Sequence, residues 1–512
     1  MPIRITGLNS GLDTESIISA LVSSYNYKTQ KYEKAQTKLS WKQDAWKELN
    51  TKIYSLYKNV GNLRLSTSYN LKSATVSDTT KATVTAGSNV VNGTYSVQVT
   101  QLAKAGYLTG AEISKTDGTA MSSSTTLSEL GCSGGSFKVN GKEITLLGSS
   151  KISDVVDELK KAGVNASFDA KNQRFFISAK AAGEKNDFKI EAVPDANGDS
   201  TTSNNLLTAL GINESTQLKD DGTGLTRIKG ENSVIYVNGA KFEGESNDVT
   251  VNGLTIHATG VTGETYDSTG SKAFAVTVAT DTQGIYDKIK DFLSQYNSII
   301  NEMTKLYNAE SAKGYEPLTD EEKDAMSDTE VEKWEEKIKS ALLRRDDTLS
   351  GIISTMTNAM TKSYTANGKS YSLASFGIQT LGFLNAPKNE HNAYHIDGDE
   401  DDVNTSGKTD KLMAALNEDP DSVIKYMQQL TSGLYSAIDT KMKSTSLSSV
   451  YTVYNDKEMA SEYSDYTSLI TKWQDRLEQQ EEYYYKKFAA METALSKINS
   501  QSSSLSGMFG GM

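Results

Sequence analysis

Cysteine, histidine and proline are all scarce in this chain of 512 residues. Cys132 is the single cysteine, so no disulfide can form within the chain and packing must supply the stability. The three histidines, His257, His391 and His395, leave little material for acid–base chemistry near neutral pH. The five prolines are about 1% of the chain against a usual ~5%, which suits rapid refolding and also follows from a high helix content.

The chain also lacks an excess of positive charge and any long apolar run. Its formal net charge is −12. A nucleic-acid partner would favour a basic surface, so we expect no nucleic-acid binding. No apolar run is long enough for a membrane span, so we expect none. The N-terminus has no basic segment followed by an apolar core, so we expect no cleaved secretory signal peptide.

Residues 14–66 have the pattern of one long helix, for which Asp13 or Thr14 offers a capping oxygen. From Tyr32 onward, apolar residues recur at alternating steps of three and four, the period of a coiled-coil seam. A helix of this length is about 75–80 Å long and needs a partner. Residues 285–306 and 466–498 carry similar seams. The sequence therefore predicts a helical shaft with these seam residues: Leu39, Trp46, Leu49, Ile53, Leu56, Val60, Ile289, Phe292, Tyr296, Ile470, Trp473 and Leu477.

Residues 72–282 differ in texture, with Thr, Val, Gly, Ser and Asn alternating at period two, as in strands. The tripeptide V-N-G occurs four times here, and Asn-Gly is a strong hairpin signal because both residues tolerate positive φ. One short helix, "ISDVVDELKKAG", lies among the strands. The pattern predicts two small nested domains, joined through the small polar segments at 131–135 and 230–233.

The predicted fold is multidomain α and α+β, with a discontinuous coiled-coil shaft built from both chain termini and two nested, mainly β inserted domains. The expected parts are a terminal helical leg (1–40 and 470–512), a helical shaft domain (41–71 and 283–469), an inserted β domain (72–130 and 231–282) and a nested α+β domain (131–230).

An acidic run, "HIDGDEDD", is the nearest approach to a metal site. It places Asp397, Asp399 and Asp401 at alternate positions, as a calcium loop does. Such a loop also needs Gly at its sixth position and Glu at its twelfth, where this chain has Asp402 and Lys408. The pattern therefore favours a solvated acidic turn over a calcium site.

Other patterns that could carry chemistry are equally incomplete. His391 and His395 are four residues apart, as zinc ligands on a helix can be, but their neighbours predict a surface loop. The segment "DGTGLTRIKG" lacks the complete glycine and lysine pattern of a phosphate loop. Acidic pairs at 321–322 and 335–336 lie on the wet faces of predicted helices. We therefore expect no enzyme activity, no cofactor and no metal.

Six blocks of the sequence, in this order, resemble the family of bacterial flagellar filament cap proteins (flagellar hook-associated protein 2, FliD). The resemblance runs from Ile3 to Phe509 and is poorest around 385–407, whose local structure we do not predict. The blocks are "GLNSGLDTESIISALV", "VNGTYSVQVTQLA", "VNGLTIHA", "PLTDEEKDAMSDTEVEKWEEKIKSALLRRDDTLSG", "LNEDPDSVIKYM" and "RLEQQEEYYYKKFAAMETALSKINSQSSSLSGMF".

The resemblance implies a structural protein that forms a ring, commonly a homopentamer, at the tip of the flagellar filament. There it would prevent the loss of flagellin and promote flagellin polymerisation. It would leave the cell through the flagellar export channel and work outside it. The implied partners are further copies of the chain, flagellin, the hook–filament junction protein and a cytoplasmic export chaperone.

Apolar residues near both chain ends are the expected contacts with the filament and with other copies. These residues are Ile3, Ile5, Leu8, Leu12, Ile17, Ile18, Leu21, Met491, Leu495, Ile498, Leu505 and Phe509. Two alternatives remain open from the sequence. The chain could be another axial subunit of the filament or of the hook–filament junction, or a surface adhesin whose inserted β domains bind host glycans or mucin.

Overall fold

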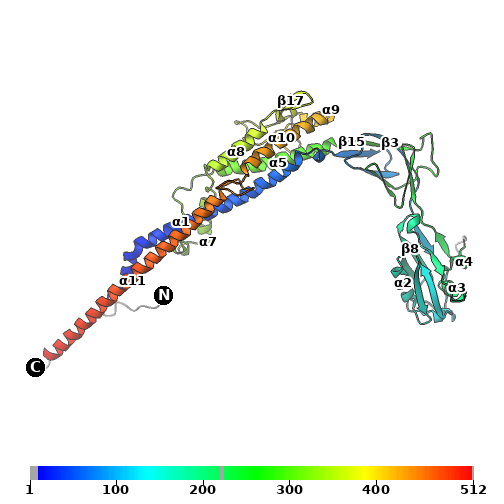
Figure 1. The fold of residues 1–512 in the computed structure, drawn as a ribbon, viewed down its shortest axis with the longest axis horizontal. Helices are drawn as coiled ribbons and strands as arrows, with labels where there is room; N and C mark the ends of the chain where they lie inside the picture. Colours follow the sequence, from blue (N-terminus) through cyan, green and yellow to red (C-terminus); the bar gives the residue numbers. More distant parts are fainter. Residues whose placement is uncertain (1–9, 220–223, 510–512) are drawn as a thin grey trace. The chain divides into compact units, whose positions relative to one another are not determined.

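The structure, a computed structural model, describes residues 10–219 and 224–509, without the side chains of the last three (Figure 1). The chain forms two compact units. Met1–Tyr69 and Thr282–Met512 make the helical unit, and Asn70–Asp281 make the sheet unit. The sheet unit is thus inserted between the two halves of the helical unit, which confirms the predicted fold class.

Helix α1 (Thr14–Leu63) begins where its cap predicts. The carboxylate of Asp13 accepts hydrogen bonds from the backbone N–H of Ser16, at 3.1 Å, and from its hydroxyl, at 2.6 Å. These bonds satisfy one of the free N–H groups of the first turn. The helix ends at Leu63, close to the predicted end at residue 66.

Helix α11 (Asp456–Phe509) lies antiparallel beside α1 (Figure 1). Asn50 donates to the carbonyl of Tyr451, at 3.2 Å, just before α11 begins. Further along, Gln36 donates to the hydroxyl of Thr467, at 2.7 Å. The two ends of the chain therefore form one helical hairpin, as the paired seams predict.

Three further helices complete a bundle, two of them (α5 and α10) packed against the second half of α1 and the third (α8) packed on those two (Figure 1). They are α5 (Thr282–Tyr307), α8 (Asp347–Met360) and α10 (Pro420–Lys441). Lys52 of α1 pairs with Glu302 of α5 at 2.7 Å, and the hydroxyl groups of Tyr57 and Tyr435 are 2.6 Å apart. These polar contacts fix the register of the bundle around its apolar core.

Two capping boxes begin the short helices α6 (Asp320–Asp324) and α7 (Asp328–Lys339). In the first, the backbone N–H of Thr319 donates to Glu322 and that of Glu322 to the Thr319 hydroxyl. The remaining regular elements of this unit are α9 (Lys411–Glu418), β16 (Tyr364–Ala366), β17 (Lys369–Tyr371), β18 (Ile378–Gln379) and β19 (His395–Ile396).

The sheet unit contains a five-stranded antiparallel sheet in the order β1-β15-β3-β11-β12 and a three-stranded sheet in the order β13-β14-β2. The two sheets share one apolar core, which includes Val97, Ile235 and Ile256. Their strands are β1 (Lys72–Val76), β2 (Ala82–Ala86), β3 (Gly93–Gln101), β11 (Ser233–Val237), β12 (Ala240–Gly244), β13 (Asp248–Val251), β14 (Leu254–Ala258) and β15 (Phe274–Thr280).

A second core lies between residues 105 and 228 of the same unit. Sheets in the orders β10-β4-β8-β7 and β6-β5-β9 pack with helices around Phe137, Leu159 and Phe175. The elements are β4 (Ala105–Thr109), β5 (Gly134–Val139), β6 (Lys142–Leu147), α2 (Ile152–Lys161), β7 (Asn165–Asp169), β8 (Arg174–Ala182), β9 (Ile190–Ala192), α3 (Thr201–Ala209), α4 (Glu214–Gln217) and β10 (Thr226–Ile228).

The passage into this second core comes earlier than the sequence predicts. Strand β4 already pairs with β8, so the passage lies at 102–104 and not at 131–135. Gly134 instead begins β5, where a Cβ atom would lie 2.4 Å from the carbonyl oxygen of Leu146. Gly134 therefore serves a close approach between two strands. The predicted return passage at 230–233 does lie between β10 and β11.

Three of the four V-N-G tripeptides form the predicted hairpin turns. Asn140, Asn238 and Asn252 all have φ near +50°, and each is followed by a glycine with positive φ. The fourth tripeptide differs, because Gly93 is already the first residue of β3. Here the prediction of a hairpin turn is wrong.

Candidate assembly surface

The predicted shaft seam divides into two parts by burial. Nine of its residues are buried, six of them on α1 and three on α5. We call these the proximal seam: Leu39, Trp46, Leu49, Ile53, Leu56, Val60, Ile289, Phe292 and Tyr296. The other three, Ile470, Trp473 and Leu477, lie on α11 and are only half-buried.

The half-buried seam residues belong to a part of the helical unit in which, over the described residues, α1 and α11 pack mainly against each other. We define the distal hairpin as residues 14–38 of α1 and 466–509 of α11. Within it the ring of Tyr25 lies 6.3 Å from that of Trp473, and the ammonium of Lys28 lies 4.1 Å from the same indole ring. One neighbouring helix covers one side of each seam residue and leaves the other side open to solvent.

The predicted terminal contact residues lie in and next to the distal hairpin. Leu12, Leu21, Ile498 and Leu505 are exposed. Three others, Ile17, Met491 and Leu495, are half-buried. Residues Ile3, Ile5 and Leu8, and the side chain of Phe509, are outside the described part of the chain.

Ile18 does not fit the predicted surface, because its side chain is enclosed within the hairpin. Val22, one turn later, is enclosed as well. Residues four apart share one face of a helix, so this face of α1 packs within the hairpin and is not available to a partner. The prediction that Ile18 is an intermolecular contact is therefore wrong for the folded hairpin.

Helix α11 continues past the level at which α1 begins. Ser10, just before α1, hydrogen-bonds through its hydroxyl to the carboxylate of Glu492. From residue 493 to 506 every side chain except Leu495 is exposed. Ile498 and Leu505 are 58% and 54% exposed on this segment, which we call the α11 extension. Seven residues are close to two turns, so these two apolar side chains lie on the same face of the helix.

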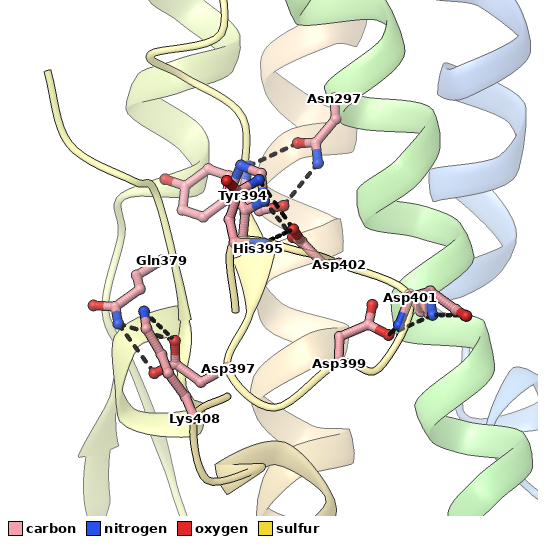
Figure 2. A network of polar contacts seen from close by, with 11 residues as sticks. Asn297, Gln379, Tyr394, His395, Asp397, Asp399, Asp401, Asp402 and Lys408 are labelled. Atoms are coloured by element: carbon pink, nitrogen blue, oxygen red, sulfur yellow. Dashed lines mark hydrogen bonds and ion pairs between the residues drawn. The ribbon is translucent and has the colours of Figure 1, made fainter. Parts of the chain in front are cut away.

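The stretch in which the family resemblance is poorest, 385–407, is held against α5 by a network of polar contacts (Figure 2). The ammonium of Lys290 on α5 lies 2.6 Å from carboxylate oxygens of both Asp399 and Asp401. Asn297, two turns further along α5, bonds both the N–H and the carbonyl of Tyr394, at 2.8 and 2.7 Å. The stretch is thus fastened to one face of α5 at two levels.

Two more polar contacts fold the acidic run onto itself (Figure 2). Lys408 lies 2.8 Å from Asp397, which also accepts hydrogen bonds from Gln379. His395 Nδ1 lies 2.5 Å from a carboxylate oxygen of Asp402. These pairs close the turn from both ends.

The ion pairs determine the charge state of the run. Burial alone would raise the pKa of Asp397, but the hydrogen bonds from Lys408 and Gln379 lower it below its ordinary value. Burial alone would also raise the pKa of Asp402, but the hydrogen bond with His395 lowers it below its ordinary value. For Lys290, burial would lower the pKa, but the two aspartates raise it overall. All three side chains are therefore charged at neutral pH.

This network corrects the prediction of a solvated acidic turn. Asp397 is buried and Asp399 is largely covered, and each is paired with a lysine. Of the residues described, no cluster of His, Cys, Asp or Glu could hold a metal ion. His391 and His395, predicted on a surface loop, each have one ring nitrogen buried. The acidic run is structural, and the cations that it binds are lysine ammonium groups. We call residues 395–402, with Lys290 and Lys408, the clasp.

Over the described ranges 10–219 and 224–509, none of the helices combines the length and the apolar character that a membrane crossing needs.

Comparison with known proteins gives matches at both ends of the chain. The family model described as "Flagellar hook-associated protein 2 C-terminus" matches residues 230–500, and the corresponding N-terminus model matches residues 10–106. The chain is 26% identical to flagellar hook-associated protein 2 of Halalkalibacterium halodurans, over 99% of this chain and all of that protein. It is also 26% identical to the protein of the same name from Thermotoga maritima, over 73% of this chain and 54% of that one.

Solved structures with the same overall description are more distant. The D1-D2-D3 domains of the flagellar cap protein FliD from Escherichia coli match with a TM-score of 0.47 and 20% identity, covering 78% of this chain and 96% of that chain. FliD from Pseudomonas aeruginosa PAO1 matches with a TM-score of 0.31 and 23% identity, over 45% of this chain and 93% of that one. With the two family models spanning residues 10–106 and 230–500, the chain belongs to the flagellar hook-associated protein 2 family.

Proposed function

We propose that this chain is a structural cap at the distal, extracellular end of the flagellar filament. As a ring of several copies, commonly five in this family, it keeps flagellin from being lost and promotes its insertion during elongation. Family membership supports this role, and the chemistry of the chain is in keeping with it. For example, His395 contacts Asp402 and Asp397 pairs with Lys408 in contacts that hold the helical unit together.

The observation that carries the proposal is the distal hairpin with its α11 extension. A two-helix hairpin with exposed Leu21, Ile498 and Leu505 leaves apolar surface in water, which is unfavourable by about 25 cal/mol per Å². Such a surface is typical of a protein that completes its packing against partners. We propose that the partners are further copies of the chain and the flagellin subunits at the filament end.

We further propose that the chain leaves the cell through the flagellar export channel, delivered by a cytoplasmic chaperone, and meets the hook–filament junction protein before filament growth begins. The single cysteine, paired with no other, and the low proline content suit a chain that travels unfolded and refolds outside.

Removal of the α11 extension tests the proposal. A chain ending at residue 492 keeps the whole proximal seam and the part of α11 that lies beside α1, so it should fold. We expect cells that carry only this truncated chain to release flagellin into the medium and to be non-motile. Normal filaments and motility with the truncated chain would contradict the proposal. A ring of fixed copy number in the purified full chain supports a cap, whereas open helical polymers support another axial subunit.

A further inference from the structure

Two features of the helical unit have no role in the account above, and the first is an exposed apolar turn. Leu384 is 93% exposed and Phe383 is 79% exposed, although both are large apolar side chains. The turn has a fixed shape, because the N–H groups of Asn385 and Ala386 donate to the carbonyl of Gly382 at 3.3 and 3.0 Å. The Phe383 ring also stacks on His391 at 4.7 Å. We call Phe383 and Leu384 the knob.

The second feature is a hollow of about 650 Å³ at which α1, α11 and the turn before α8 meet. Its apolar lining includes Leu39, Trp46, Leu342 and Met459. Trp46 is stacked on Tyr454 with the ring centroids 5.3 Å apart, so this wall is rigid. We call it the shaft hollow. Its volume falls within the usual range of ligand pockets, which is large enough to hold two or more side chains.

Charge differs between the two features in a complementary way. The lining of the hollow carries two positive and four negative side chains, a net charge of −2: Lys38, Lys42, Asp346, Asp347, Glu458 and Glu462. Lys42 is already paired with Asp346, at 2.9 Å, so the surplus charge at the rim is negative. Beside the knob, Lys388 is exposed and lies near Glu310, which is itself paired with Lys337, whereas Glu390 is half-buried. The knob therefore presents apolar surface next to a positive charge, which suits an acidic rim.

The knob and the hollow lie at the same level along α1. Helix α5 runs antiparallel to α1, with Glu302 opposite Lys52. Asn308, six residues beyond Glu302, donates to Asn389 in the loop that follows the knob, at 3.1 Å. Six residues of helix are about 9 Å, which brings this loop to the level of Trp46 in the hollow.

The two features also lie on different sides of the helical unit. Gln295 and Glu302 of α5 face α1, to which both are hydrogen-bonded. Asn297 and Asn308 hold the 385–407 stretch and the loop after the knob. Because each residue turns a helix by 100°, residues 295 and 297 point in nearly opposite directions. The loop that carries the knob is therefore on the side of α5 that is turned away from α1.

We propose that the knob of one copy of this chain inserts into the shaft hollow of the next copy. A contact between two different patches is heterologous, and it closes into a ring when the patches lie at one level along the ring axis. With an offset in level it would build an open helix instead. The inference rests on the proposed ring and names the surfaces that close it.

Disulfide cross-linking tests the pairing in the full-length chain. In a Cys132→Ala background, Leu384→Cys is combined with Glu462→Cys at the rim of the hollow. A disulfide needs Cα atoms within about 7 Å, so it forms only if the knob enters the hollow of a neighbour. We expect a ladder of covalent multimers up to the size of the ring. The matched control, Leu384→Cys with Asp44→Cys on another face of α1, should give none.

A second variant tests the same contact without cysteine chemistry. Leu384→Asp should weaken association by tenfold or more, because it places a negative charge at the acidic rim, while the circular dichroism spectrum of the monomer stays unchanged. The second control, Asn385→Asp, adds the same charge one residue along and should weaken association far less.

The outcomes separate the pairing from the ring. Rings of normal mass that neither cross-link at 384–462 nor respond to Leu384→Asp would overturn the pairing and leave the cap proposal standing. Cross-linked dimers from Leu384→Cys alone would overturn it too, because they indicate knob-to-knob contact. A full chain that stays monomeric at every concentration would overturn both proposals.

Discussion

The two halves of α1 both carry apolar residues on a helix, but their surroundings differ. In the proximal half, where α5, α10 and α11 pack against α1, Trp46, Ile53 and Val60 are almost wholly buried. In the distal half, α1 has α11 beside it, and Leu21 remains 44% exposed on a helix whose other face encloses Val22. A heptad seam thus specifies that a helix packs against others, but not how many of them belong to its own chain.

From this difference we expect the proximal half to be stable alone and the distal half not to be. Short helical hairpins depend on tertiary packing, because propensity and single side-chain pairs contribute only a few tenths of a kcal/mol each. The proximal seam has that packing within the chain. The distal hairpin has half of it, and under the proposed function its second half comes from other copies and from flagellin.

Tryptophan truncation should give the largest contrast between the halves. Trp46→Ala removes an enclosed side chain that stacks on Tyr454, and we expect a loss of about 3–5 kcal/mol in the free energy of unfolding. Trp473→Ala, the matched change in the distal hairpin, should cost about 1 kcal/mol, because that ring is half-exposed. Urea unfolding of the monomer measures both. Equal losses would contradict the division into two halves.

The clasp on α5 should show a smaller effect of the same kind. Lys290→Met leaves Asp399 largely covered without its cation, so we expect a loss of about 1–3 kcal/mol in the free energy of unfolding. The distal control is Lys486→Met, which removes an exposed pair with Glu482 at 3.5 Å. That change should stay within about 0.5 kcal/mol. An unchanged free energy of unfolding in Lys290→Met would mean that the clasp does not stabilise the unit.

Apolar residues of the α11 extension should matter for assembly and not for the monomer. The double change Ile498→Ser and Leu505→Ser removes exposed side chains. The free energy of unfolding of the monomer should therefore change by less than about 0.5 kcal/mol. Ring formation, followed by the mass of the particles in solution, should weaken about tenfold or more. Ser500→Ala in the same segment is the control. Unchanged assembly would show that this face is not a contact.

Acid should weaken the contacts of Asp397 and Asp402, and we expect this loss of stability to be the smallest of the effects. The folded state lowers the pKa of Asp397 and Asp402, whereas the unfolded chain has the ordinary value near 4. Below about pH 5 the unfolded state therefore binds more protons, and the stability contributed by these carboxylates is lost as the pH falls through 4 toward their folded pKa. Unfolding measured at pH 7, 5 and 3.5 should show this decline. Asp397→Asn should flatten it, and an identical slope in that variant would contradict the assignment.

Much of the secondary structure could be predicted because its signals are local. Asp13, Thr319 and Ser327 cap helices through bonds to residues three positions away, and three Asn-Gly turns specify hairpins in the same manner. The clasp could not be predicted, since Lys290 meets Asp399 from a position 109 residues earlier in the chain. No local pattern distinguishes that lysine from a solvated one.

The glycines at 131–135 show another limit. A glycine-rich segment reads as a linker, but the same residues are needed wherever two backbones approach closely. Gly134 has a strand neighbour that would clash with any Cβ, and only the fold reveals that neighbour. The prediction of contact residues near the chain ends has the same limit. Spacing identified an apolar face, but Ile18 and Leu21 differ in burial because of where α11 lies.

Hydrogen exchange of the full chain, free and assembled, tests the central claim most directly. In the free chain we expect slow exchange for amides of α1 residues 46–63 and fast exchange for 14–30 of α1 and 480–506 of α11. On assembly, the distal amides should become protected while the proximal ones stay as they were. Distal amides that are already slow in the free chain, or that stay fast in the assembled ring, would contradict the claim that partners complete the distal hairpin.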